Sequence, residues 1–182
     1  MTTNAQRINQ DSGKVEYYTP YFIILSVKRT MGAIDLDPAS CKKANTIVHA
    51  KKYFTVDDDA LNQPWFGRVW MNHPFSKTNN PLWTTKLIDE FESDHVTEAC
   101  CITFASTSEK WFLPLMKYPQ CYLSPRLNYL NGSTMKKIAG ITKGSVITYF
   151  GPSLSAFYKN FHTYGTILLP YDYRWHLKGM YQ

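Results

Sequence analysis

The chain has 182 residues, of which 44% are hydrophobic and 15% aromatic, and its formal net charge is +6. This composition supplies a core for one globular domain and excludes a disordered chain, a collagen-like repeat and a disulfide-stabilised mini-protein. No apolar run approaches the roughly 20 residues of a membrane span, so no membrane partner is expected. Residues 1–15 lack the apolar stretch of a signal peptide, and we expect a disordered arm there, followed by a single domain over residues 16–182.

Charge is unevenly distributed along the chain. Residues 1–109 hold 11 Lys and Arg against 13 Asp and Glu, whereas residues 110–182 hold 9 basic residues and one acid, Asp172. A cationic C-terminal third is typical of a surface that faces a polyanion. The alternative is a basic face that only keeps the protein in solution.

Cysteine and histidine spacing indicates neither disulfides nor a metal site. No C-x-x-C pair occurs, and reduced, buried thiols in a cytoplasmic protein are expected. The four cysteines are Cys41, Cys100, Cys101 and Cys121. The five histidines have no mutual metal-ligand spacing, so no metal is predicted.

Helices and strands alternate in the first half of the chain. A helix is predicted to begin at Thr19-Pro20, where threonine can cap and proline fits the first turn, and to end at Gly32. There follow in order a strand over 33–37, a helix over 40–51, a strand over 53–55, an acidic loop at 57–59, a strand over 68–72 and a helix over 81–91.

Strands dominate the second half. The pattern predicts in order a strand over 96–104, a helix over 106–116, strands over 121–123 and 145–150, a helix over 156–161 and a strand over 166–169. The spacing of Ser106 and Glu109 is that of a capping box, which places a helix start there. Strand–helix alternation followed by closely spaced strands predicts an α/β fold with a mainly parallel sheet and an antiparallel edge.

The strongest candidate for chemistry is the tetrapeptide Asn72-His73-Pro74-Phe75, at the carboxyl end of a predicted strand. Open α/β sheets bind ligands at that end. An asparagine and a backbone carbonyl can accept hydrogen bonds from an exocyclic amine, and an aromatic ring can stack on a planar base. The alternative is a turn that closes the strand, with Phe75 in the core.

Acidic residues form two further candidates. Asp35 to Ser40 place acids at a strand end before small residues, which suits a ligand with a ribose or an ammonium group. One acid of Asp57 to Asp59 is placed to accept from the amino group of an adenine ring. Solvated acidic surfaces are the alternative for both, and neither G-x-G-x-x-G nor a Walker sequence is present.

The order of these short motifs resembles the phage-type DNA N-6-adenine methyltransferase family, the small Dam-like enzymes of phages and prophages. The resemblance runs from about Glu16 to about Gly165. It rests on Glu16-Tyr17-Tyr18-Thr19-Pro20, Leu36-Asp37-Pro38-Ala39-Ser40, Tyr53-Phe54-Thr55, Asp59-Ala60-Leu61, Trp65, Arg68 to Ser76 and Trp83.

The resemblance implies a Rossmann-like methyltransferase fold with S-adenosylmethionine as methyl donor and DNA as partner. The residues that match the family's cofactor motifs are Thr19, Pro20, Asp37, Pro38, Ser40 and Asp59. The match to its catalytic tetrapeptide consists of Asn72, His73, Pro74 and Phe75. In that chemistry Asn72 and the carbonyl of residue 73 accept from the target amine, while Phe75 stacks on a flipped adenine.

His73 stands where the family pattern has its first proline, and we expect a looser loop there because the fixed φ of proline is lost. Phosphate contacts are expected from the basic C-terminal third, namely Arg126, Lys136, Lys137 and Lys143. The alternatives are a methyltransferase acting on RNA or on a protein amide, and a DNA-binding protein that uses the fold as a scaffold. A phage-encoded enzyme of this kind is expected in the host cytoplasm.

Overall fold

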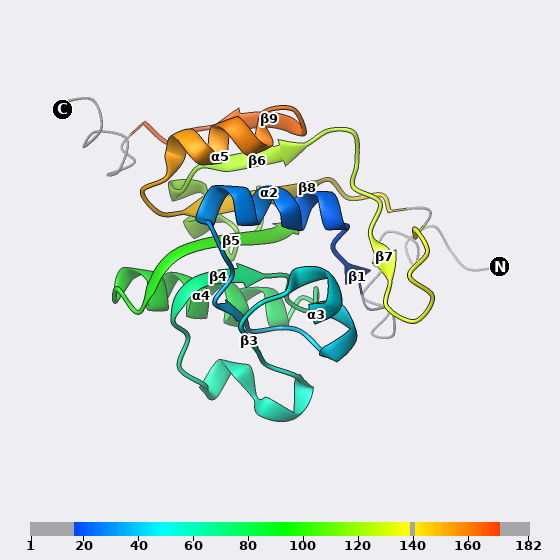
Figure 1. Cartoon of the computed structure of the whole chain (residues 1–182). Coiled ribbons are helices and arrows are strands. Elements are labelled where there is room, and N and C mark those ends of the chain that lie inside the picture. The colour runs from blue at the N-terminus through cyan, green and yellow to red at the C-terminus, as the bar shows by residue number, and fades with distance from the viewer. Residues whose placement is uncertain (1–16, 139–140, 172–182) are drawn as a thin grey trace.

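A sheet of seven strands forms the centre of the structure, a computed structural model that describes residues 17–138 and 141–171 (Figure 1). The strands lie in the order β3-β2-β4-β5-β8-β6-β9. Their bounds are β2 Leu36–Asp37, β3 Lys52–Tyr53, β4 Gly67–Met71, β5 Val96–Phe104, β6 Gln120–Leu123, β8 Ser145–Phe150 and β9 Gly165–Leu168. A separate antiparallel pair joins β1 (Tyr17–Tyr18) to β7 (Leu130–Asn131), so that the start of the described chain lies against its last third.

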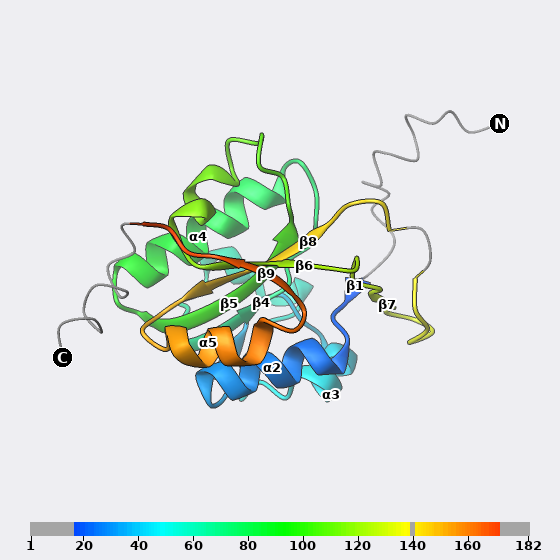
Figure 2. The same ribbon diagram turned by 90° about the horizontal axis from the view of Figure 1, so that it is seen from above.

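Helices cover both faces of this sheet, as the view from above shows (Figure 2). One face carries α2, α3 and α5, and the other carries α4. The bounds are α2 Tyr21–Met31, α3 Lys42–Val48, α4 Asn79–Glu92 and α5 Leu154–Phe161. Short 3-10 helices occupy Val56–Asp58, Ala60–Asn62 and Leu113–Lys117.

The two faces of the sheet have separate apolar cores because side chains alternate along each strand. On β5, Cys100 and Ile102 point into the core beneath α2 and α5, whereas Ala99 and Cys101 point into the core beneath α4. All four side chains are fully buried. This explains why β5, a central strand buried on both faces, has apolar residues at successive positions from Ala99 to Ile102.

The prediction of a mainly parallel sheet with an antiparallel edge is only partly confirmed. Pairs β3-β2, β2-β4 and β4-β5 are parallel, but β5-β8, β8-β6 and β6-β9 are antiparallel. The sheet is therefore mixed, and half of the pairings between its neighbouring strands are antiparallel. The physical reason is that β8 inserts between β5 and β6, an arrangement set by long-range pairing that no local pattern reports.

The prediction of an α-helix over 106–116 is wrong. This region forms a turn closed by the hydrogen bond from Phe112 N–H to Glu109 O at 2.9 Å, and then the 3-10 helix Leu113–Lys117. Pro114 explains the difference, because proline has no N–H to donate and its ring clashes with an α-helical turn. Strands β1 and β7 were not predicted either, because each is a two-residue segment that pairs only with the other, far along the chain.

The order in which the chain forms its parallel strands creates a switch point in the sheet. From β2 the chain moves outward to β3, then returns to the other side of β2 for β4 and continues to β5. The carboxyl ends of β2 and β4 thus flank a topological switch point, where open α/β sheets form a crevice. Asp37 ends β2 and Asn72 follows β4, so both motifs found in the sequence meet at this crevice.

All four cysteines are free thiols; Cys100, Cys101 and Cys121 are buried and Cys41 is half-buried. Burial raises the pKa of the Cys101 thiol to about 12, which leaves it protonated and unreactive. Within residues 17–138 and 141–171, no helix has the length and apolar character needed to cross a membrane.

Candidate active site

A pocket of about 740 Å³ opens at the carboxyl ends of β2 and β4. Its volume lies within the range of small-molecule sites. Nine of the ten residues predicted as catalytic or cofactor-binding line it: Thr19, Asp37, Pro38, Ser40, Asp59, Asn72, His73, Pro74 and Phe75. Pro20 lies outside the lining, and its carbonyl oxygen instead accepts the first hydrogen bonds of α2, from Ile23 and Ile24.

The amide of Asn72 has a defined orientation. Its Nδ2 donates to the backbone carbonyl oxygen of Tyr17 at 2.7 Å and to Thr19 Oγ1 at 3.1 Å. An asparagine amide has two hydrogens, so these bonds use its full donor capacity. The Oδ1 atom is left as an acceptor in a pocket-lining, half-buried side chain.

The residues after Asn72 supply a second acceptor and an aromatic surface. His73 and Pro74 line the pocket next to Asn72, so the His73 carbonyl is the neighbouring backbone acceptor. The ring of Phe75 is half-buried and packs against Phe104, with 4.6 Å between ring centroids, and against Tyr129 at 6.2 Å. Phe75 therefore contacts the core and lines the pocket as well, which combines the two alternatives that its sequence context left open.

The two acids at the β2 end have different surroundings. Asp37 is 2% exposed, and burial raises its pKa to about 7, with the Ser40 hydroxyl and the Ala39 N–H offsetting only part of that rise. Asp35, which precedes the strand, does not line the pocket. It accepts from Arg68 Nε at 2.7 Å and faces Lys51 Nζ at 2.8 Å.

Ser40 adds a polar atom to the same wall. Its Oγ is buried and lies close enough to the Asp37 carboxyl to affect its pKa, but it forms no hydrogen bond of ordinary length and angle among the described residues. A buried hydroxyl without such a bond costs free energy, which a ligand that bonds to it would recover. The carboxyl of Asp37 and the hydroxyl of Ser40 are thus suited to a ligand with a positive charge and hydroxyl groups.

Asp59 also lines the pocket. It is exposed, adopts a left-handed conformation with φ 47°, and accepts a hydrogen bond from Asn62 Nδ2 at 2.7 Å. The next residue, Ala60, is held by Trp65, whose Nε1 donates to the Ala60 carbonyl at 2.8 Å. This acidic loop, predicted only as a loop, is therefore ordered by two 3-10 turns.

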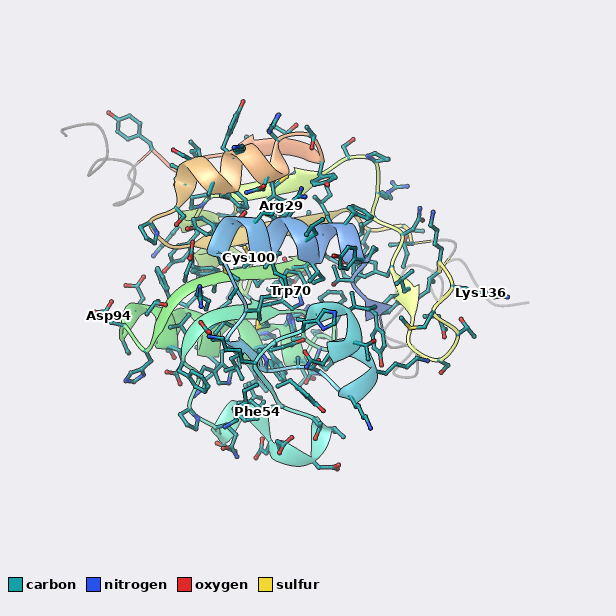
Figure 3. The ribbon with its side chains drawn as sticks, viewed as in Figure 1. Arg29, Phe54, Trp70, Asp94, Cys100 and Lys136 are labelled. Carbon is teal, nitrogen blue, oxygen red and sulfur yellow. The ribbon has the colours of Figure 1, made fainter. Side chains whose placement is uncertain are left out.

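The predicted DNA-binding residues lie outside the pocket lining, in the segment of the chain that connects β6 to β8. Arg126, Lys136, Lys137 and Lys143 are all exposed. Lys136 and Lys137 belong to a hairpin over residues 129–138, in which Lys137 pairs with Leu130, and Figure 3 shows Lys136 on it at the edge of the molecule. The hairpin includes β7, which pairs with the pocket-lining strand β1, so it stands next to the pocket.

Two contacts tie the basic segment to the pocket walls. Lys143 Nζ lies 5.4 Å from the centroid of the Phe104 ring, which itself packs on Phe75. Lys43 of α3 donates from Nζ to the carbonyl oxygen of Ser133, at the hairpin tip, at 2.6 Å. These two contacts bring the segment between β6 and β8 beside the site without placing its cations in the site.

Sequence reasoning assigned no role to several groups that shape the pocket. The Tyr17 carbonyl orients Asn72, and Asn80 bonds to the His73 ring through its Oδ1, 3.0 Å from Nε2. Trp83 lines the pocket beside His73. Tyr17 and Trp83 lie within the motifs that resembled the family, which was the available signal, whereas nothing local marks Asn80.

Comparison with known proteins agrees with this geometry. A DNA N-6-adenine-methyltransferase of Escherichia phage T1 is 25% identical over 149 residues, which cover 71% of this chain and 59% of that relative. The chain therefore spans less than two thirds of the length of the curated relative that it matches. The family model described as DNA N-6-adenine-methyltransferase (Dam) matches residues 7–164. That match includes every pocket residue named above, and the chain belongs to the DNA N-6-adenine-methyltransferase (Dam) family.

Proposed function

We propose that this chain transfers a methyl group from S-adenosylmethionine to the exocyclic amino group of adenine in DNA. The observation that carries the proposal is the orientation of Asn72, whose two amide hydrogens are bound by Tyr17 and Thr19. An acceptor oxygen is thereby presented beside a second acceptor, the His73 carbonyl, in a pocket with an aromatic wall. Membership of the Dam family supports the same reaction.

For the fold we propose the Rossmann-like arrangement of S-adenosylmethionine-dependent methyltransferases, in a single domain over residues 16–182. Three parallel pairings around β2 and β4, helices on both faces and a pocket at the switch point support it. In open α/β sheets ligands bind in the crevice outside the carboxyl ends of the strands, at such a switch point.

The pocket residues fit S-adenosylmethionine in charge and in hydrogen-bonding capacity. This cofactor has a cationic ammonium and sulfonium, ribose hydroxyls and an adenine ring. Asp37 offers a carboxyl, Ser40 a buried hydroxyl and Asp59 a second carboxyl in the lining. Thr19 and Pro38 complete the proposed cofactor set as pocket-lining neighbours of Asn72 and Asp37.

When bound, S-adenosylmethionine supplies an electrophilic methyl group. The protein's part is to present the adenine amine to it. Asn72 Oδ1 and the His73 carbonyl accept the two N–H groups, which directs the nitrogen lone pair out of the ring plane. Phe75 stacks on the base, which must leave the duplex to enter a pocket. Positioning of this kind accounts for most of the rate, with no side chain required as a general base.

DNA binding is proposed for the exposed cations between β6 and β8. Lys136 and Lys137 project from a hairpin that is paired to a pocket wall, and Lys143 lies over Phe104. Together with Arg126 they would neutralise phosphates next to a base that enters the pocket. A phage-type enzyme of this kind acts in the host cytoplasm, where its DNA substrate lies.

Incubation with methyl-labelled cofactor and separate DNA, RNA and protein acceptors tests the proposal. We expect label in DNA only, recovered as N6-methyladenine after digestion to nucleosides. The Asn72→Ala variant, which removes the acceptor, is the matched control and should leave no label in DNA. Label in RNA or protein, in place of DNA, would contradict the proposed substrate, and cofactor-independent DNA binding without transfer would favour a scaffold role.

A further inference from the structure

The side chain of His73 has no role in the mechanism above, which uses only its backbone carbonyl. Yet the imidazole is 2% exposed and lies at the pocket wall. Burying a polar ring costs free energy unless it is bonded. The contacts of this ring therefore indicate which interactions compensate for the cost of burying it.

Three contacts surround the imidazole, and two of them come from the start of α4. Nε2 lies 3.0 Å from Asn80 Oδ1. The ring stacks on Trp83, with 6.1 Å between centroids and 19° between planes. It also meets Phe75 edge-on, at 5.3 Å and 89°.

The hydrogen bond to Asn80 defines the tautomer. An amide oxygen can only accept, so the hydrogen resides on Nε2 and Nδ1 carries a lone pair. Nδ1 is buried without a partner among the described residues. Burial lowers the pKa of His73 to about 4, which keeps the ring neutral at physiological pH.

Resting on the proposed function, we propose that the His73 imidazole is a positioning residue for methyl transfer. Its Nε2–H bond to Asn80 and its stacking on Trp83 fasten the loop after β4 to the rigid first turns of α4. The loop holds the His73 carbonyl and the Phe75 ring, which meet the base together with Asn72 Oδ1. A proline at position 73 would restrain this backbone through its ring, whereas here side-chain contacts supply the restraint.

Steady-state methylation of an adenine-containing duplex by four proteins tests this assignment. His73→Gln can place a donor where Nε2 lies, whereas the shorter His73→Asn reaches only the Nδ1 position and His73→Ala reaches neither. We expect kcat to fall by about 10²-fold in the Ala and Asn variants and to be largely restored in the Gln variant. The KM for cofactor should stay at its parental value in all of them, because Asp37 and Ser40 are untouched.

A double-mutant cycle with Asn80 separates a specific link from general loosening. Asn80→Ala removes the acceptor from the same bond, so the double variant His73→Ala/Asn80→Ala should lose no more activity than His73→Ala alone. Additive losses would show that the two residues act independently, which overturns the proposal. Thermal unfolding of each variant identifies any that fails to fold, and the Gln variant then carries the comparison.

Hydrogen exchange provides a measurement that needs no activity. The Ala and Asn variants should exchange faster over residues 72–80, with β5 unchanged and the Gln variant at the parental rate. Parental exchange in this segment for the Ala variant would overturn the inference whatever the substrate. A parent protein that methylates no DNA would instead refute the proposed function, while a parental kcat in an active His73→Ala protein would refute the inference alone.

Discussion

Asn72 donates from its side-chain amide to the backbone carbonyl of Tyr17, at 2.7 Å and across 55 residues of sequence. The orientation of the candidate catalytic amide therefore depends on β1, a strand of two residues. That strand is itself held by pairing with β7, on the segment that carries Lys136 and Lys137. The site and the proposed DNA-binding hairpin thus share one structural support.

This relationship makes position 72 sensitive to the loss of a donor as well as an acceptor. Asn72→Asp keeps an acceptor oxygen but turns a carboxylate toward the Tyr17 carbonyl, where two oxygens repel. We expect the turnover number to fall by about 10²-fold or more for both Asn72→Asp and Asn72→Ala. Cofactor affinity, measured by calorimetry, should change little, and an active Asn72→Asp protein would mean that the bond to Tyr17 does not orient the amide.

The buried carboxyl of Asp37 should make folding stability depend on pH. The unfolded chain ionises this group near its ordinary pKa of 3.8, whereas burial raises the pKa to about 7 in the folded protein. The folded state holds the extra proton between these values, so this group lowers stability as pH rises through the window. Asp37→Asn should therefore match the parent near pH 4 and be more stable above pH 7, by about 4 kcal/mol at most. Urea unfolding across this pH range measures the difference, and a constant difference would contradict it.

Cofactor binding should show the opposite pH trend at the same residue. S-Adenosylmethionine is cationic, so ionisation of Asp37 favours it and the affinity of the parent should rise as pH passes through about 7. Asp37→Asn should bind more weakly, with no such rise. Isothermal titration at several pH values tests this, and an unchanged dissociation constant in the variant would remove Asp37 from the cofactor site.

The hairpin lysines should set the salt dependence of DNA binding. Each phosphate contact releases counterions, so Lys136→Gln/Lys137→Gln should flatten the slope of log affinity against log salt by roughly two units. Arg29→Gln/Lys159→Gln removes the same charge from exposed positions on α2 and α5, with Arg29 shown away from the hairpin in Figure 3. That control should keep the parental slope. Equal slopes for the hairpin variant and the parent would leave a solubilising role only.

The ion pair of Asp35 and Arg68 should stabilise the fold without affecting the site. Hydrogen bonding from the Arg68 guanidinium holds the pKa of Asp35 well below its usual range. A lowered pKa gives stability that is present above the unfolded pKa and lost as pH falls. Asp35→Asn should cost about 1–3 kcal/mol at neutral pH, with the difference shrinking below about pH 4. Lys51→Gln is the control, because Lys51 is 70% exposed and its pair with Asp35 contributes little.

Local patterns in the sequence were sufficient to predict several helices and strands and to identify both motifs that line the pocket. The strands over 96–104 and 145–150 have the bounds of β5 and β8, because long apolar runs between turn residues are unambiguous when a strand is buried on both faces. Helix α4 begins two residues before its predicted start, and α3 is shorter than predicted because His49 adopts a left-handed conformation. The structure brings Asp37 and Asn72 into one pocket because β2 and β4 are parallel neighbours whose carboxyl ends share an edge of the sheet.

The sequence by itself thus determined the α/β class, the two motifs and the basic C-terminal third, all of which depend on neighbouring residues or on composition. Only the tertiary structure decided that β8 separates β5 from β6, that Tyr17 orients Asn72 and that Asn80 holds His73. It also gave the two acids of the β2 motif different surroundings: Asp37 lines the pocket, whereas Asp35 forms an ion pair with Arg68. These outcomes depend on which distant groups can be buried and hydrogen-bonded together, and the free energy of such contacts is a property of the packed chain that no short stretch of sequence contains.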